Sequence, residues 1–196
     1  MIDVGAAPLL IPLYASWLYT VTSYYDYWRN PSLYTQFPAC VDRLVQNVYG
    51  WMPLSLGLTL LIRPVVVWSH PLWQEAYHAF LNLVLGEIWF YTLHRLLHQP
   101  CLFWLHRQHH ELVRPVGALA LYAHPIDAIG VNLGSMLLLH ILIGFSFLQL
   151  LLIGSVATVS TILTSHTGRT GGPHQDHHRR YTVNYGTGLF MDRLFG

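Results

Sequence analysis

Five apolar stretches, each close to the length of a bilayer-crossing helix, constrain this chain more than any other feature. They cover about residues 7–24, 49–68, 77–93, 127–145 and 147–165, and a helix needs roughly 20 apolar residues to cross a bilayer core. Charged residues make up only 10% of the sequence, against about 25% in ordinary soluble domains. Too few charges remain to cover a soluble surface, so the sequence predicts an all-α integral membrane protein.

Arginine placement orients these stretches. Cytoplasmic loops of membrane proteins carry an excess of basic residues, and this chain has no lysine. All but one of its arginines fall in 25–48, 94–126 or 166–196, which we therefore place on the cytoplasmic side, with the N-terminus outside. The first stretch can instead be re-entrant, so four and five spans both stay open. The nine arginines are Arg29, Arg43, Arg95, Arg107, Arg114, Arg169, Arg179, Arg180 and Arg193.

The remaining arginine, Arg63, lies inside the second apolar stretch. Intramembrane charges are costly and usually paired, and Glu87 in the third stretch is the predicted partner. The alternative is that Arg63 extends toward the outer interface, where its charged head reaches water.

Histidine is unusually abundant, and ten of the thirteen form an ordered series on the arginine-rich side. His94 and His98 are four residues apart, so they share one helical face. Two HxxHH boxes follow, in which the i, i+3 and i, i+4 relations are predicted to turn three side chains toward one place. The series comprises His94, His98, His106, His109, His110, His124, His166, His174, His177 and His178.

Such a cluster is typical of a metal centre. Neutral imidazole binds iron, zinc and copper well, and one tetrahedral zinc needs only four ligands. Eight to ten histidines therefore predict two metal ions, and two adjacent redox metals can bind dioxygen. Isolated histidines on apolar faces are more often core residues, which is our interpretation of His70, His78 and His140.

Other function classes explain less of this pattern. A membrane haem protein for electron transfer, with paired histidines as axial ligands, accounts for two to four histidines and leaves the HxxHH boxes unexplained. A zinc hydrolase of the HExxH type is not indicated, because that motif is absent. A metal transporter is expected to hold its ligands near the membrane midplane. The formal net charge of +1 gives no basic field for nucleic acid.

The ordered motifs resemble those of the fatty acid hydroxylase/sterol desaturase superfamily. The resemblance covers about residues 77–196, and 1–76 matches only as N-terminal membrane segments. The matching elements are His94-Arg-Leu-Leu-His98, His106-x-x-His109-His110, His124-Pro-Ile-Asp127, His166-Thr-Gly, His174-x-x-His177-His178, Thr-Val-Asn184-Tyr-Gly186 and Met-Asp192-Arg-Leu-Phe-Gly196.

The resemblance implies four membrane helices with a cytoplasmic helical cap that carries the histidine boxes, and an endoplasmic reticulum location if the source is eukaryotic. It implies two iron ions, for which zinc can substitute in purified protein, with dioxygen as co-substrate. The ten histidines of the series become metal ligands, His124 being a ligand or a group behind one. Electrons would come from a separate donor such as cytochrome b5 with its NAD(P)H reductase.

The implied reaction is hydroxylation or desaturation of a lipid drawn from the bilayer. The His124-Pro-Ile-Asp127 element looks more like sterol desaturases and C-4 methyl sterol oxidases, which favours a sterol; a fatty-acyl or sphingolipid hydroxylase is the alternative. Glu87, Asp127, Asn184 and Asp192 are expected to orient ligand imidazoles, with capping or turn formation as the competing role for the last three.

Overall fold

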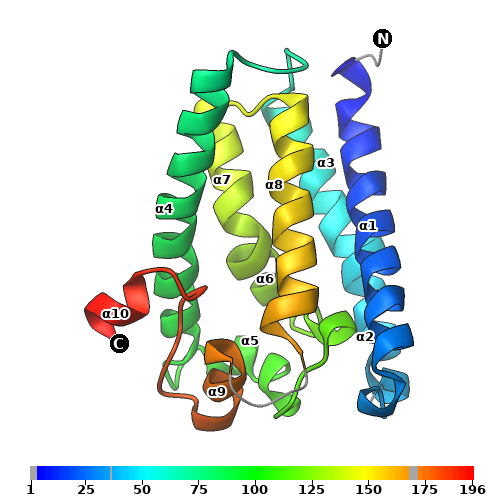
Figure 1. Cartoon of the computed structure of the whole chain (residues 1–196), viewed down its shortest axis with the longest axis vertical. Helices are drawn as coiled ribbons and strands as arrows, with labels where there is room; N and C mark the ends of the chain where they lie inside the picture. Colours follow the sequence, from blue (N-terminus) through cyan, green and yellow to red (C-terminus); the bar gives the residue numbers. More distant parts are fainter. Residues whose placement is uncertain (1–3, 36, 168–171) are drawn as a thin grey trace.

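The computed structural model describes residues 4–35, 37–167 and 172–196, and these are helical apart from connecting segments and an isolated bridge between Val116 and Thr167. Long helices run side by side along the longest axis of the molecule, and short helices gather at one end (Figure 1). The long elements are α1 (Ala7–Arg29), α3 (Met52–Ile62), α4 (Leu72–Leu97), α7 (Gly134–Ile143) and α8 (Phe147–Ser160).

Short π-helical turns lengthen three of these elements. η3 (Asn47–Trp51) joins α2 (Phe37–Gln46) to α3, η6 (Ala128–Leu133) joins α6 (Pro125–Asp127) to α7, and η7 (Thr161–Ser165) extends α8. Two of the resulting continuous helices, Pro125–Ile143 and Phe147–Ser165, are long and apolar enough to cross a membrane. They coincide with the last two stretches predicted from the sequence.

A tight turn joins these two helices, as the sequence predicts. Gly144 ends α7 in the left-handed conformation, with φ of 74°, which glycine adopts without the steric penalty of a side chain. Ser146 begins α8 by accepting a hydrogen bond from the backbone N–H of Gln149 at 3.1 Å, an N-terminal cap of the usual kind.

The outer faces of the bundle are apolar. Leu13 and Trp17 on α1 are each 58% exposed, Leu61 on α3 is 66% exposed, and Phe80 on α4 is 60% exposed. Soluble monomers rarely expose apolar surface on this scale. These faces suit contact with lipid.

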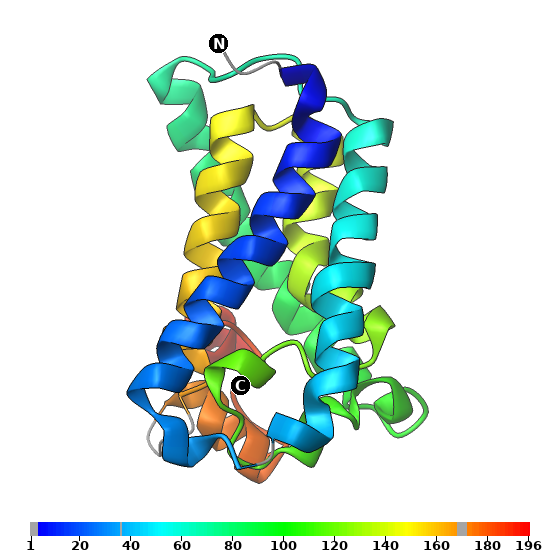
Figure 2. The same cartoon turned by 90° about the vertical axis from the view of Figure 1, so that its right-hand side faces the viewer.

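The short helices lie at the end of the bundle opposite the N-terminus (Figures 1 and 2). Besides α2, they are α5 (Phe103–His106), η4 (His109–Glu111), η5 (Gly117–Leu119) and α9 (Pro173–Arg180). α10 (Met191–Phe195) lies alongside α4, further from this end than α9 (Figure 1). α1 ends at Arg29 on this side, and α9 carries Arg179 and Arg180 here as well. Of the nine arginines used to orient the chain, Arg169 lies outside the described residues.

The predicted ion pair between Arg63 and Glu87 is wrong. Arg63 is exposed directly after α3, and its guanidinium lies beside Gly144 at the turn end of the bundle. Glu87 is 2% exposed and lies further along α4, toward the short helices, where Thr187 donates to its carboxylate. The antiparallel course of α3 and α4 separates the two side chains, and the alternative, in which the charged head of Arg63 reaches the end of the bundle, agrees with its exposed position there.

Two histidines outside the series have the core role expected of them. His140 donates from Nε2 to the carbonyl of Arg63 at 2.7 Å and accepts at Nδ1 from the backbone of Phe145 at 3.1 Å. His78 hydrogen-bonds the side chain of Gln149 at 3.2 Å. Both help to fix the turn end of the bundle, away from the ten-histidine series.

Candidate metal centre

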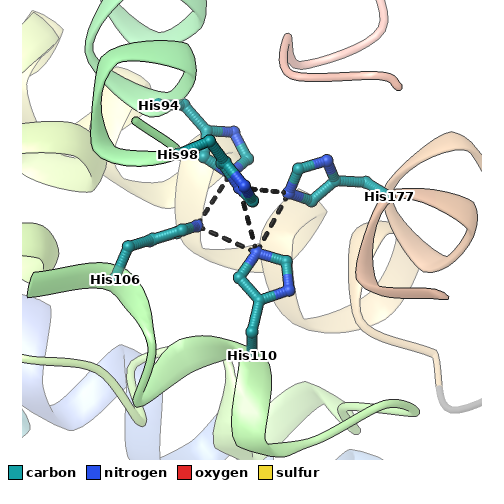
Figure 3. Close-up of side chains that lie close together, drawn as sticks. All are labelled: His94, His98, His106, His110 and His177. Atoms are coloured by element: carbon teal, nitrogen blue, oxygen red, sulfur yellow. Dashed lines mark hydrogen bonds between the residues drawn. The ribbon is translucent and has the colours of Figure 1, made fainter. Parts of the chain in front are cut away.

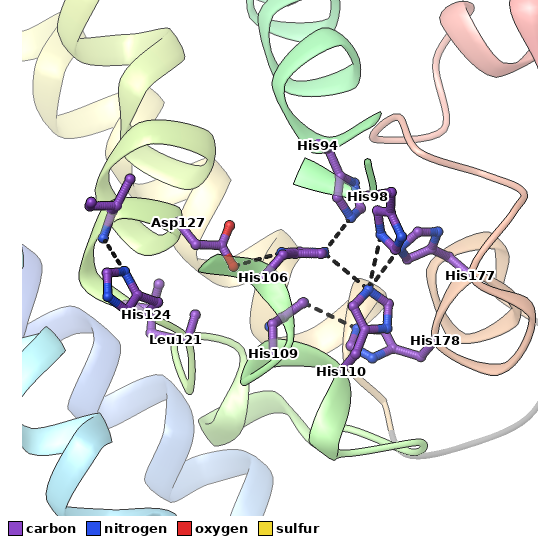
Figure 4. Close-up of polar contacts among 12 residues, drawn as sticks. His94, His98, His106, His109, His110, Leu121, His124, Asp127, His177 and His178 are labelled. Carbon is purple, nitrogen blue, oxygen red and sulfur yellow. Dashed lines mark hydrogen bonds and ion pairs between the residues drawn. The ribbon is translucent and has the colours of Figure 1, made fainter. Parts of the chain in front are cut away.

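Nine histidines of the series converge in two buried groups beneath α4. Within each group, the potential ligand atoms all lie within 4.8 Å of one another. Group one is drawn in Figure 3, and Figure 4 shows it beside part of group two. Group one contains His94, His98, His106, His110 and His177; group two contains His109, His166, His174 and His178.

Each HxxHH box divides its histidines between the groups. The first box gives its i and i+4 members to group one and His109 to group two; the second gives its i and i+4 members to group two and His177 to group one. Residues i and i+4 lie close together on a helical surface, whereas i+3 is displaced to the other side of i. The expectation that each box turns three side chains to one place is therefore wrong.

Three members of group one have a fixed tautomer. The Nδ1–H of His94 donates to the carbonyl of Tyr185 and that of His177 donates to the carbonyl of Val183, each at 2.7 Å. His106 donates from Nδ1 to the carboxylate of Asp127, also at 2.7 Å. Because a carbonyl or carboxylate only accepts, the proton of each neutral ring lies on Nδ1. Each Nε2 is left with a bare lone pair.

These lone pairs point at one another. The Nε2 atoms of His94 and His106 are 3.0 Å apart, and Nε2 of His110 lies 3.0 Å from that of His106 and 3.1 Å from that of His177 (Figure 3). Nitrogens bound at about 2.0–2.1 Å to one metal, at angles of roughly 90–109°, would be separated by about 2.9–3.4 Å. The residues present therefore fit a metal ion, which would turn a repulsive contact into a set of ligand bonds.

Group two has the same spacing and a sparser outer support. Its Nε2 atoms are 3.0 Å apart between His166 and His174, 3.1 Å between His109 and His178, and 3.2 Å between His174 and His178. His166 contacts the carbonyl of Thr161 through Nδ1 at 3.1 Å. The buried Nδ1 of His178 has no hydrogen-bond partner among the described residues, nor has that of His110 in group one.

Burial keeps these imidazoles neutral at physiological pH. It lowers the pKa of His177 in group one and of His166 in group two to about 4, because a low-dielectric interior disfavours the charged ring. The pKa values of His109 and His174 are also lowered, by burial first and then by neighbouring histidines. Neutral imidazole is the form that ligates metal.

The structure does not bring His124, the tenth predicted ligand, into either group. Its Nδ1 accepts a hydrogen bond from the backbone of Ile126 at 3.3 Å, and its ring packs on Trp104 with 5.6 Å between centroids. His124 thus caps α6, the helix that carries Asp127 to His106 (Figure 4). Asp127 itself has the orienting contact expected from the sequence.

The other three predicted orienting residues act on backbone and not on imidazoles. Glu87 accepts from the backbone of Thr187 at 2.9 Å and of Met191 at 3.3 Å, and Asp192 accepts from the N–H of Gly186 at 3.0 Å. These contacts hold the segment 183–191, here called the C-terminal loop, against α4. Asn184, with φ of 55°, donates to the carbonyl of Pro173 at 3.1 Å, which is the alternative turn-forming role.

Sequence reasoning missed the backbone acceptors in this loop. The carbonyls of Val183 and Tyr185 orient His177 and His94, yet backbone oxygens leave no residue signature. The one available signal is Gly186, where an added Cβ would meet Oε1 of Glu87 at 2.6 Å and a carboxylate oxygen of Asp192 at 2.9 Å. Only glycine fits there without displacing the loop.

A sequence model of the fatty acid hydroxylase family matches residues 79–196, which include both histidine groups. The chain belongs to the fatty acid hydroxylase family. This confirms the resemblance inferred from the histidine motifs, and the family's matched region contains every metal-ligand candidate. No solved structure matches the chain.

The curated relatives of this chain are named either as fatty acid hydroxylases or as methylsterol monooxygenases. "Fatty acid hydroxylase domain-containing protein 2" of Macaca fascicularis is 31% identical over 158 residues, 73% of this chain and 47% of that protein. "Methylsterol monooxygenase 1" of Rattus norvegicus is 32% identical over 58% of this chain and 43% of its own length. "Fatty acid hydroxylase ahd1" of Mycosarcoma maydis is 32% identical over 58% and 31%. The chain thus spans less than half the length of each of these three relatives.

Proposed function

We propose that this chain is a dioxygen-dependent membrane oxygenase that hydroxylates or desaturates a lipid. One observation carries the proposal: nine imidazoles, seven of them buried and two half-buried, form two adjacent groups, and the fixed tautomers of group one aim bare nitrogens at a common point. The family match and the monooxygenase and hydroxylase names of its relatives support an oxidoreductase that acts on lipids.

Two iron ions are the proposed cofactor, one for each group. When bound, a pair of redox-active irons supplies the one-electron and dioxygen chemistry that side chains cannot perform. The five histidines of group one and the four of group two would hold them. The chain itself contributes orientation, because Asp127 and the C-terminal loop fix the imidazoles, and a buried setting that keeps the ligands neutral.

The rings also argue against the haem alternative. A porphyrin between two axial imidazoles needs an open slot between them, whereas neighbouring rings in group one contact each other, with centroids 4.4 Å apart between His94 and His177. The close nitrogen contacts suit single ions instead.

The membrane setting of the proposal rests on apolar surface. Two helices have the length and composition of spans, and α1, α3 and α4 expose large apolar side chains on the same bundle. We extend this to four or five spans, with the histidine groups at the cytoplasmic face and, in a eukaryote, in the endoplasmic reticulum. The substrate would enter from the bilayer, and a cytochrome b5-type donor with its NAD(P)H reductase would supply electrons.

A sterol is the favoured substrate class, and a fatty-acyl lipid is the alternative. The His-Pro-Ile-Asp element, which favours a sterol, also forms part of the site, because its Asp127 orients His106. The methylsterol monooxygenase relative supports the same class, while the relative from Mycosarcoma maydis supports the alternative.

Metal analysis of detergent-purified protein tests the core of the proposal. We expect about two iron or zinc ions per chain, and oxidation of a sterol or fatty-acyl lipid when the iron form receives dioxygen, cytochrome b5 and its reductase. No bound metal after anaerobic loading with ferrous iron, or one haem per chain, would contradict it. Comparison of a 4-methyl sterol with a fatty acyl lipid in the same assay decides the substrate class.

A further inference from the structure

Two tyrosines lie between histidine group one and the surface of the molecule. Tyr181 follows α9, Tyr185 belongs to the C-terminal loop, and both side chains are half-buried. The ring of Tyr181 lies on that of His110, with centroids 4.6 Å apart and planes tilted by 33°. The ring of Tyr185 is 5.1 Å from that of His98 and 5.4 Å from that of His177. Each tyrosine therefore contacts ligand candidates of group one and also reaches the surface.

The positions of both rings are fixed. The hydroxyl of Tyr181 donates to the carbonyl of His110 at 3.3 Å, and the hydroxyl of Tyr185 donates to the carbonyl of Tyr181 at 3.1 Å. Tyr181 has φ of 65°, a conformation that bulky residues rarely adopt and that often occurs at functional sites. The guanidinium of Arg95 lies over the ring of Tyr185, 5.7 Å from its centroid. The fold thus holds two phenols against one histidine group.

Histidine group two has no comparable neighbours. Within the part of the chain that the structure describes, the ring contacts of its members are all with other histidines. The other non-histidine rings that contact group one are those of Phe90 and Phe103, and a phenyl ring resists one-electron oxidation far more than a phenol does. The two tyrosines are therefore the readily oxidised rings in contact with the candidate metal centre.

A phenol beside an oxygen-activating metal has a chemical use. Iron that reduces dioxygen supplies one-electron chemistry, and without a lipid in place the nearest oxidisable groups are the ligand histidines themselves. A tyrosine loses an electron more easily than an imidazole does, and electrons cross between rings in contact rapidly. Oxidation can thus leave group one through Tyr181 or Tyr185 before a ligand is damaged.

We propose that Tyr181 and Tyr185 form an electron relay that protects group one when dioxygen is reduced in the absence of lipid. The relay rests on the proposed function, because it requires redox-active iron in group one. In the relay step, a tyrosine gives one electron to the oxidised iron, its O–H bond breaks, and the proton passes to water at the surface. A soluble reductant of the ascorbate class then returns one electron, and a proton from water restores the phenol.

Radical detection tests the relay. The full chain, iron-loaded in detergent and free of lipid substrate, is mixed with hydrogen peroxide and frozen for electron paramagnetic resonance spectroscopy. We expect a tyrosyl radical in the wild type and loss of most of that signal in Tyr181→Phe/Tyr185→Phe. Tyr181→Phe/Tyr185→Trp should form an indole radical instead, whereas a merely structural role would be served better by phenylalanine than by tryptophan. The zinc-loaded wild type should give no radical.

Mass spectrometry of the same samples gives a second measurement. Peptides that carry the group one histidines should be oxidised several-fold more in Tyr181→Phe/Tyr185→Phe than in the wild type, while oxidation of group two is unchanged. Tyr14→Phe is the control, because the hydroxyl of Tyr14 shares a hydrogen bond with Ser155 at 2.8 Å, between α1 and α8. This variant should match the wild type in radical yield and in histidine oxidation.

Metal content and lipid oxidation with the electron donor are measured for every variant, and if the double variant loses metal, the two single variants decide. The relay would be overturned, with the proposed function intact, if the wild type bound iron and oxidised lipid but formed no tyrosyl radical. An undiminished signal or unchanged histidine oxidation in Tyr181→Phe/Tyr185→Phe would also overturn it. A wild-type chain that binds no iron would overturn both proposals.

Discussion

The two histidine groups are alike in spacing and differ in what stands behind them. Group one takes five rings, three of which are fixed by acceptors at 2.7 Å, and one of these acceptors is a buried carboxylate. Group two takes four rings, with the carbonyl of Thr161 at 3.1 Å behind His166 and a backbone contact from Tyr122 behind His109. Only group one receives ligands from α4.

Because of this difference, the two metal positions, one in each histidine group, are not equivalent. Groups behind a ligand fix its orientation and raise its basicity, and a carboxylate does so more strongly than a carbonyl. We therefore expect group one to hold its ion more tightly and group two to present the more adaptable position. The predictions below separate the groups, beginning with the largest expected effect.

Removal of neighbouring ligands gives the sharpest test. His177 and His178 are adjacent in the sequence but belong to different groups. His177→Ala should remove metal from group one, and His178→Ala should remove metal from group two. In each variant the metal content should fall from about two ions per chain toward one. Lipid oxidation should fall at least roughly 100-fold in both, beyond the effect of orienting residues. Elemental analysis and turnover measure this, and full metal content in either variant would contradict the assignment.

The carboxylate behind His106 should matter to group one alone. Asp127→Asn keeps the size of the side chain and removes its charge, so affinity at group one should fall roughly 10-fold while group two is unchanged. Timed metal loss to a chelator, with one fast and one slow phase, resolves the groups. Asp176→Asn on α9 is the matched control, because Asp176 pairs with Arg179 at the surface; an equal effect of both variants would remove the special role of Asp127.

The C-terminal loop gives a smaller effect on the same group. Gly186→Ala places a methyl group 2.6 Å from Glu87 and 2.9 Å from Asp192, which should destabilise the protein by about 1–3 kcal/mol and loosen the contacts of Tyr185 and Val183 with their histidines. A several-fold faster metal loss from group one is expected. Gly154→Ala on α8 is the control, since a Cβ there meets nothing within 4 Å. Equal behaviour of the two variants would disprove the role of the loop.

Acid should act on both groups to a similar extent. His177 and His166, one from each group, have pKa values lowered to about 4, against about 6.5 in an unfolded chain. The unfolded state therefore binds more protons, so the stability of the metal-free protein should be full above pH 6.5 and decline toward pH 4. The melting temperature should fall by roughly 5 °C or more between pH 7 and pH 5. A flat profile would mean that these rings are not buried in solution.

Much of the centre could be predicted from the sequence, because its chemistry resides in side chains. The histidine series, the family and the orienting role of Asp127 follow from spacing and residue type. Each apolar stretch contains a helix, but the helix in the second stretch, predicted over 49–68, ends at Ile62, and two helices have the length and composition of membrane spans. Helical spacing separates the i+3 member of each box from the other two, but which group each member joins depends on where the neighbouring helices lie. His124 lies outside both groups because Pro125 begins helix α6 and the His124 side chain caps that helix.

Other features depend on backbone and packing. The roles of the Val183 and Tyr185 carbonyls cannot be recognised from residue identity. The antiparallel course of α3 and α4 separates Arg63 from Glu87, although their opposite charges favour a pair. Pairwise charge arguments fail where the fold, and not chemical affinity, decides which groups meet.

The exchange of histidines between the boxes also has a thermodynamic consequence. η4 and α9 each contribute histidine ligands to both groups. An ion that binds in one group therefore fixes helices that also carry ligands of the other group. The second ion then meets a preorganised site and pays less conformational entropy than the first. Filling of one group is thus expected to raise the affinity of the other group for its ion.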